Sequence, residues 1–535
     1  MSRVDSPMVF RLPALVLTAI ALGFAARPAA AQFLAPALDR AGFDVRARQP
    51  SLRLAMLGGT SLAFQDENNE INLWDFGVAT TGLLSDRDST SLDVWFDGRS
   101  RKDHHTVSST RFETDRKGAL NTGLLAVGRN PGKFAAGLDG SYLTFNSAVP
   151  AQTGVYEDAS IGLPVAVPTV GGTAFGRRAL WGARFLFGQE SLTRELRTMS
   201  VDGDDVELTD GQVVDEPNFF DRNEFDTNLL GIGFGLGWDQ ANLGQIAIQY
   251  DHVDQHVKGK NETARRVFET DEKRPITEYS LTAIAAPASL SWLRAGLSVG
   301  RLMFHTTEDY RFSLSGGTGG IPLQGRGNRL DHDQRLDYLR TRVDLTPGGS
   351  AKNLLVGADF NVRYDHDHVE PTTAPNDFNP FIDAIAADTL ELPQKVASEV
   401  QELRHWDAGV GLGYRFTDRM SAGAEVHRYN NARDGLSIHA RQRITDLRGG
   451  VEYLLNPTWT ARVGGWHRSD DKDVYTANNE LVANALTLGA GYAPPTSSYA
   501  LDAGFEFTQR STNFPDPTEE EGSGIRFMAY GRWRF

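Results

Sequence analysis

Three groups of residues in this chain have types and spacings that could support chemistry. Gly296-Leu297-Ser298-Val299-Gly300 matches the G-x-S-x-G pattern of hydrolases by its letters. That pattern requires the serine at a sharp turn between a strand and a helix, where its hydroxyl can act as a nucleophile. Here the pattern lies inside the run 293–299, in which every second residue is apolar, so it indicates an extended strand. We therefore predict no catalytic residue here and no enzymatic activity.

The second group consists of histidines interleaved with carboxylates, as in Asp365-His366-Asp367-His368 and Asp331-His332-Asp333. Carboxylates bind hard cations, and imidazole favours zinc or copper. Neither cluster has the i, i+4 histidine spacing of a helical zinc site. We expect both clusters to be solvated ends of strands or loops, and we predict neither a bound metal ion nor any other cofactor.

The third group consists of charged residues that occupy alternate positions in apolar runs. Alternate side chains of a strand point to opposite faces, so each run has one apolar and one charged face. In a barrel embedded in lipid the charges belong to the lumen, because Arg or Lys at the lipid midplane costs about 2–4 kcal/mol. The predicted pore-lining residues are Arg340, Arg342, Asp359, Arg363, Glu425, Arg448, Glu452, Arg462, Glu506, Arg526 and Arg532. They line a solvated pore or, alternatively, form a lattice of salt bridges that stiffens a closed barrel.

The elements that would position these residues are alternating runs of about 9–13 residues, the length that a tilted strand needs to cross a bilayer. Short connections, as at 241–244 and 417–420, alternate with long ones, as at 254–275 and 366–402. Outer-membrane barrels combine tight periplasmic turns with long extracellular loops in this way. The sequence therefore predicts an all-β fold, a transmembrane antiparallel β-barrel.

The number of strands is predicted by counting these runs backward from the C-terminus. About thirteen runs alternate clearly between Asn228 and Phe535. Upstream, weaker runs lie at 91–98, 106–113, 119–128, 134–146 and 181–187, and 147–178 is either a further strand or a long excursion. We predict roughly 16–18 strands, with about 14 if some early runs are loop hairpins.

Both ends of the chain carry export signals. Arg3 and Arg11 flank an uncharged apolar run, and Ala29-Ala30-Ala31 supplies a small-residue cleavage site. This pattern predicts a secretory signal peptide at 1–31. At the other end, residues 525–535 alternate and finish on Phe535. This ending resembles the C-terminal strand of Gram-negative outer-membrane barrels, which implies the barrel-assembly machinery as a partner that reads the final aromatic residue.

Composition narrows the class further. The 535 residues include no cysteine and carry a formal net charge of −15. The lack of cysteine excludes disulfides, iron–sulfur clusters, a c-type haem site and an acylated lipoprotein anchor. The acidity argues against nucleic acid as a partner. After the signal peptide no apolar stretch reaches the ~20 residues of a spanning helix, so a membrane protein of this sequence must be a closed barrel.

A segment between the signal peptide and the first predicted strand does not alternate. We predict three regions: the signal peptide at 1–31, a hatch or plug at 32–90, and the barrel at 91–535. Within the plug, residues 53–73 resemble the N-terminal hatch motif of FadL-type outer-membrane transporters of hydrophobic compounds. The positions that match this motif are Gly58, Gly59, Ala63, Asp66 and Asn72. The sequence departs from the motif at Leu73-Trp74, which replaces Pro-Ala, and at the additional Leu57.

The resemblance implies passive transport of small hydrophobic compounds through a barrel whose lumen is occluded by the hatch, with exit through a gap in the wall. Such a solute crosses the polar lipopolysaccharide leaflet poorly, and burial of its apolar surface would supply its affinity. Phe378, Phe381, Ile382 and Ile385 lie at helical spacing in a loop, as a capture helix or a small loop core. The expected partners are outer-membrane lipid, lipopolysaccharide and a small solute. The alternatives are a general porin and a barrel for surface structure or polymer export.

Overall fold

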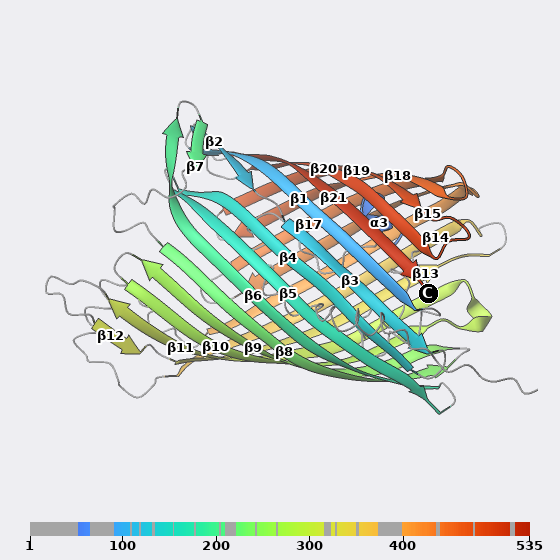
Figure 1. The fold of residues 1–535 in the computed structure, drawn as a ribbon, viewed down its shortest axis with the longest axis horizontal. Helices are drawn as coiled ribbons and strands as arrows, with labels where there is room; N and C mark the ends of the chain where they lie inside the picture. Colours follow the sequence, from blue (N-terminus) through green and yellow to red (C-terminus); the bar gives the residue numbers. More distant parts are fainter. Residues whose placement is uncertain are drawn as a thin grey trace, which may run out of the picture.

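The chain forms a closed antiparallel β-barrel in a computed structural model (Figure 1). The structure describes residues 52–64 and 90–535, except 108–109, 117–118, 131–133, 153–154, 176–177, 203–204, 209–220, 241–242, 264–265, 315–322, 327–328, 349–351, 373–398, 435–438, 475–476 and 514–518. Within the described residues, 18 strands follow one another around the wall. The predicted transmembrane β-barrel is confirmed, at the upper end of the predicted strand number.

The elements have the following bounds. The wall strands of the first half are β1 (Ser91–Val107), β3 (Ala119–Asn130), β4 (Phe134–Gln152), β5 (Val155–Ala174), β6 (Ala179–Asp202), β8 (Asp221–Gln240), β9 (Gly244–Thr263), β10 (Arg266–Ala285) and β11 (Leu293–Leu314). Those of the second half are β13 (Arg329–Leu345), β14 (Leu354–Thr372), β15 (Glu399–Thr417), β16 (Met420–Asp434), β17 (His439–Leu454), β18 (Trp459–Val474), β19 (Ala477–Tyr492), β20 (Tyr499–Asn513) and β21 (Glu519–Arg534). The short elements are β2 (Thr110–Arg116), β7 (Asp205–Leu208), β12 (Leu323–Arg326), helix α3 (Leu52–Met56) and the 3-10 turn η1 (Ala288–Leu290). Among the described residues, no helix has the length and apolar character needed to cross a membrane.

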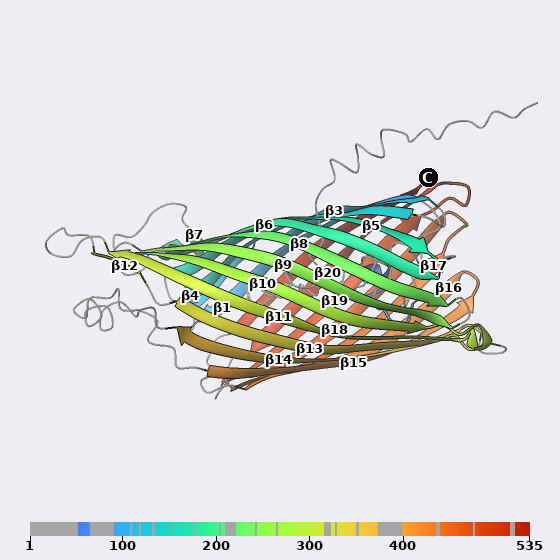
Figure 2. The ribbon, with the colours of Figure 1, turned by 90° about the horizontal axis from the view of Figure 1, so that it is seen from below.

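The barrel closes where the first and last strands meet. β1 pairs with β21 from Ser91 opposite Arg534 to Thr106 opposite Glu519, and it pairs with β3 on its other side. Two ion pairs span this seam: Arg526 Nε lies 2.7 Å from Asp97, and Arg532 Nε lies 2.9 Å from Asp93. Because β1 is paired on both sides, the sheet has no open edge there. Figure 2 shows the elongated barrel with β12 and β7 near one end and the C-terminus at the other.

The two faces of the wall differ in polarity over much of the described barrel. On β16, Val426 is 42% exposed, whereas its neighbours Glu425 and His427 are 5% and 4% exposed. Exposed apolar side chains at outward positions recur around the wall, as at Leu230, Phe234, Leu297, Phe360, Leu412, Leu447, Val463, Leu486, Phe505 and Phe527. An apolar outside and a polar inside are what a barrel in lipid requires.

One prediction about the upstream strands was wrong, and one of two alternatives is confirmed. Residues 106–113 are not a spanning strand, because β1 ends at Val107 and β2 begins at Thr110 in a hairpin beyond the wall. Residues 147–178, in contrast, contain the spanning strand β5. Its prolines and glycines weakened the alternating pattern on which the prediction rested.

The predicted long connections were also partly wrong. Residues 254–263 and 266–275 are strand rather than loop, because β9 and β10 stay paired to Glu262 opposite Val267. Near this tip Lys258 faces Asp271, and Lys260 faces Glu269. Opposite charges facing each other across two strands stabilise the pair without any apolar face. The wall strands are therefore longer than the runs that alternate.

Candidate functional site

The lumen segment, residues 52–64, lies against the inner wall formed by the second half of the barrel. It consists of helix α3 and the extended turn that follows it, and α3 contacts β18 to β21. Figure 1 shows α3 among these strands. Leu54, Met56 and Leu57 are 0% exposed and Leu62 is 1% exposed. Burying a leucine side chain contributes about 1.5–3 kcal/mol, so the segment is packed rather than loosely tethered.

Two glycines end helix α3. Gly58 N–H donates to Ala55 O at 3.2 Å, and Gly59 N–H donates to Leu54 O at 2.9 Å, which is the Schellman arrangement. Both glycines have φ of +77°, a left-handed conformation that strains other residues. A Cβ on Gly58 would also overlap the backbone of Gly465, whereas a Cβ on Gly59 would meet only Arg448 at 3.8 Å. Gly58 therefore serves both the turn and the close approach to the wall.

The wall beneath the lumen segment is built of glycines. A Cβ at any of these positions would collide with Met56, Leu57, Gly58, Leu62 or Ala63. We call them the glycine bed: Gly357 on β14, Gly411 and Gly413 on β15, Gly423 on β16, Gly450 on β17, Gly464 on β18, Gly489 on β19 and Gly504 on β20. For example, a Cβ on Gly450 would lie 2.7 Å from Leu57 O. Because these glycines have no side chains, they leave room for the segment to lie directly against the wall.

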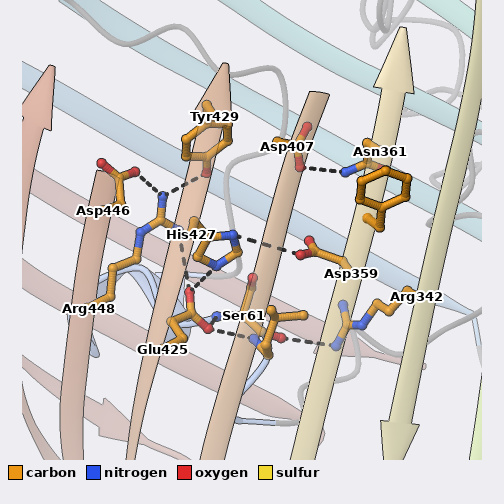
Figure 3. Close-up of polar contacts among 12 residues, drawn as sticks. Ser61, Arg342, Asp359, Asn361, Asp407, Glu425, His427, Tyr429, Asp446 and Arg448 are labelled. Atoms are coloured by element: carbon orange, nitrogen blue, oxygen red, sulfur yellow. Dashed lines mark hydrogen bonds and ion pairs between the residues drawn. The ribbon is translucent and has the colours of Figure 1, made fainter. Parts of the chain in front are cut away.

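Charged wall residues hold the backbone of the lumen segment (Figure 3). Glu425 Oε2 accepts hydrogen bonds from Ser61 N–H at 2.8 Å and Leu62 N–H at 2.7 Å. Arg448 donates to Gly59 O, and Arg342 donates to Ser61 O, each at 3.0 Å. Hydrogen bonds to charged groups are the strong ones, so these anchors fix the position of the turn.

A second set of anchors holds α3. Arg53 donates to both carboxylate oxygens of Glu452, at 2.8 and 2.7 Å, and Arg462 donates to the same carboxylate at 2.8 Å. Thr487 Oγ1 donates to Met56 O at 2.8 Å. The helix is thereby attached to β17 by charge and to β19 by a neutral hydrogen bond.

The charges around the anchors are paired along the wall. His427 Nε2 lies 3.0 Å from Glu425 Oε1, and Arg448 lies 2.9 Å from Asp446, which also contacts Arg468 at 2.7 Å. Figure 3 shows this network extending from His427 to Asp359 on β14, with the pair of Asn361 and Asp407 beside it. Two of these pairs lie within one strand, and the pair of Arg468 and Asp446 joins β18 to β17. They suit the lattice alternative more than an open, solvated charge lining.

The structure places every predicted pore-lining residue at an inward position of its strand. Six of them contact the lumen segment or lie in the networks around it: Arg342, Asp359, Glu425, Arg448, Glu452 and Arg462. Arg526 and Arg532 join the closing seam, and Glu506 contacts Arg526. Arg363 faces Asp365 at 3.7 Å, and Arg340 lies over the ring of Tyr338 at 5.1 Å. Whether any of them meets a passing solute stays a prediction.

The predicted hatch residues are only partly within the described residues. Gly58, Gly59 and Ala63 belong to the lumen segment, and Ala63 is 2% exposed next to Gly423. Asp66, Asn72 and the predicted capture helix at 378–386 lie outside the described residues. Their roles, and the division of the chain at 31 and 90, stay predictions.

The other chemical candidates behave as strand residues. Ser298 is fully buried within β11, where it accepts a hydrogen bond from Thr282 at 3.0 Å, and no nucleophile elbow is present at this position. Among the described residues, no cluster of three or more His, Asp or Glu side chains has the geometry of a metal site.

Sequence reasoning missed the glycine bed and several wall partners, including Asp93, Asp97 and Asp446. A signal for the bed was present: glycines occupy inward positions at similar heights on successive strands, from Gly357 to Gly504. Glycine weakens a strand, so its repetition on one face suggests a close approach by another backbone.

Several solved structures are distantly similar to this chain. No family model and no curated protein sequence matches the chain. The Pseudomonas putida toluene transporter TodX has 12% identity and a TM-score of 0.35, over 91% of this chain and 98% of its own. A Pseudomonas aeruginosa FadL homologue has 12% identity and a TM-score of 0.31, over 90% and 96%. The ferric citrate transporter FecA has 8% identity and a TM-score of 0.39, over 84% and 79%.

Proposed function

We propose that this protein is an outer-membrane transporter that passes small hydrophobic compounds passively around a plug formed by the lumen segment. The observation that carries the proposal is the seating of residues 52–64 on the glycine bed inside the barrel. A general porin keeps a water-filled channel. Glycines in the wall that make room for a segment of the same chain favour occlusion instead.

The surface of the barrel supports the location in a membrane. Outward positions carry exposed apolar side chains, and aromatic rings gather at the short turns. There Trp459 lies 4.7 Å from Tyr492, and Tyr414 lies 4.9 Å from Phe416, measured between ring centroids. Aromatic belts of this kind lie at the interface between lipid and water.

An apolar patch on the inner wall supports the substrate class. Ile276, Leu302, Phe304 and Leu336 form one cluster on β10, β11 and β13, with Val253 and Tyr338 packed against it. These residues occupy inward positions, as do many charged and hydroxyl side chains elsewhere on the inner wall. A hydrophobic solute can bury apolar surface against such a patch, which it cannot do against a charged wall.

A weak point in the wall supports lateral exit of the solute. The pairing of β5 with β6 skips Leu163 and Pro164 and again Val167 and Pro168, while the pairing of β5 with β4 continues through both prolines. Proline has no N–H to donate, so the ladder toward β6 is interrupted at two places. We propose that an apolar solute leaves the lumen between these strands.

The test is uptake of toluene into cells that make the protein, combined with conductance of the purified protein in planar bilayers. We expect faster uptake than in cells without the protein, and little steady ion conductance. Large open channels would support a porin instead. An unchanged uptake rate at verified surface levels of the protein would refute the proposed substrate class.

A further inference from the structure

A polar patch lies on the outside of the wall, where the lipid-facing surface ends. Its lower row is Arg301, Asp337, Tyr364 and Arg404, which lie opposite one another on β11, β13, β14 and β15. Its upper row is Met303, Arg335, His366 and Glu402 on the same strands. We call these two rows the outer patch. They share the outward parity of Leu297 and Val299, which are 44% and 37% exposed.

The boundary between this patch and the lipid-facing surface is sharp. The next row toward the short turns consists of Val299, Leu339, Val362 and Trp406, again directly opposite one another. Two residues along each strand therefore separate a fully apolar row from a charged one. A bilayer has this profile at the level where acyl chains give way to headgroups, and Tyr364 and Trp406 are the residue types enriched there.

Arginines outnumber carboxylates in the outer patch. Asp337 accepts from Arg301 at 2.6 Å and from Arg335 at 2.6 Å, and Glu402 accepts from Arg404 at 2.8 Å. Within the two rows, three arginines thus stand beside two carboxylates, which gives the rows a net positive formal charge. The side chains of these arginines are 45%, 52% and 62% exposed, so their guanidinium groups are accessible from outside.

The opposite sector of the barrel lacks this feature. There the row Leu486, Phe507, Ile525 and Ser100 is followed toward the tips by Asn484, Gln509, Ser523 and Lys102. Within these described rows, amides and hydroxyls replace the arginines, and Lys102 is the sole cation. The three arginines thus have no counterpart in the rows compared on β19, β20, β21 and β1, a difference that a general need for polar residues at the bilayer boundary does not explain.

We propose that the outer patch binds the phosphate groups of the phosphorylated glycolipid, lipopolysaccharide, that surrounds the barrel in the outer leaflet. Guanidinium groups match phosphate oxygens in bidentate geometry. The acyl chains of the same lipid would lie along the apolar row beneath. The inference rests on the proposed location in the outer membrane, but not on the transported solute.

The experiment measures binding of bis-phosphorylated lipid A to the purified full-length protein by native mass spectrometry in detergent. The test variant combines Arg301→Gln, Arg335→Gln and Arg404→Gln. We expect its affinity for lipid A to fall at least about tenfold, since each arginine offers charge-assisted hydrogen bonds to phosphate. The corresponding triple lysine variant should retain part of the affinity, and Lys102→Gln in the opposite sector should retain all of it.

Two further measurements separate the possible outcomes. Lipid A with a single phosphate should bind the unaltered protein more weakly, and this difference should vanish in the triple glutamine variant. Equal binding of lipid A by the unaltered protein and the triple glutamine variant would overturn the proposal. Heat-modifiable migration on gels checks that each variant is folded, and toluene uptake in the same cells tests the proposed function independently.

Discussion

At the scale of single residues, the position of the lumen segment depends on glycines, which lack a Cβ, as much as on charged side chains. Gly58 and Gly59 have the same φ of +77°, yet only Gly58 faces wall backbone at a distance that excludes a Cβ. This pair separates the strain of a left-handed residue from the cost of a collision. Inward charges such as Glu425 and Arg448 could be predicted from alternation alone. Their partners in the lumen segment could not, because they lie hundreds of positions away, as with Thr487 and Met56 at a separation of 431.

We predict that Gly58→Ala displaces the lumen segment and that Gly59→Ala largely does not. Both changes carry about 1–2 kcal/mol of left-handed strain. Gly58→Ala adds an overpacking cost of about 1–3 kcal/mol against Gly465. The measurement is maleimide labelling of Ala55→Cys, a buried position in a chain with no other cysteine. Labelling should rise several-fold with Gly58→Ala, and similar rates in the two variants would contradict the proposed close approach.

A carboxylate gives a second prediction at this scale. Glu425→Gln should loosen the turn of the lumen segment, because one charged oxygen accepts from both Ser61 and Leu62. Hydrogen bonds to a charged group contribute about 1.5–3 kcal/mol, and an amide oxygen replaces only part of this. Glu506→Gln is the matched control, because Glu506 contacts the wall residues Trp466 and Arg526. Labelling of Ala55→Cys should increase for the first variant and stay unchanged for the second.

At the scale of elements, alternation predicted strands only where lipid and lumen make different demands on the two faces. Beyond the bilayer both faces of a hairpin meet water, so the pattern disappears although the pairing continues, as between β9 and β10. Residues 147–178, which contain β5, could not be assigned to a strand or a loop from the sequence for a second reason. Its Pro164 and Pro168 resemble loop residues in a sequence, yet the neighbouring strand β4 keeps both in register.

The interrupted ladder of β5 leads to a prediction about exit. Replacing Pro164 and Pro168 with valine restores the missing N–H donors toward β6, and each hydrogen bond regained contributes about 0.5–1.5 kcal/mol. We expect slower toluene uptake with no change in ion conductance, because the lateral opening would be closed. Pro275→Val is the control, since it restores a ladder between β10 and β11 at a distance from β5. Unchanged uptake in the β5 variant would place the exit elsewhere.

At the scale of the whole molecule, the barrel consists of two parts whose stability differs in origin. The wall is continuous and is closed by β1 and β21 with ion pairs at Asp93 and Asp97. The lumen segment contributes no strand and is held by the glycine bed and a few charged anchors. Deleting a segment that belongs to no strand leaves every pair in the wall intact. Plug and wall can therefore be separated by experiment.

Deletion of residues 52–64 should raise ion conductance while the barrel still migrates as a heat-modifiable, folded species. The vacated bed is lined by Glu425, Arg448 and Glu452, charges that would become solvated and attract ions into the lumen. Conductance must then respond non-additively: Glu425→Gln should open the full-length protein in part but add little to the deletion, because its partners at Ser61 and Leu62 are gone. Additive effects of the two changes would mean that Glu425 acts on conduction directly. In that case the lumen segment would bind the wall without blocking the lumen, and occlusion would have another cause.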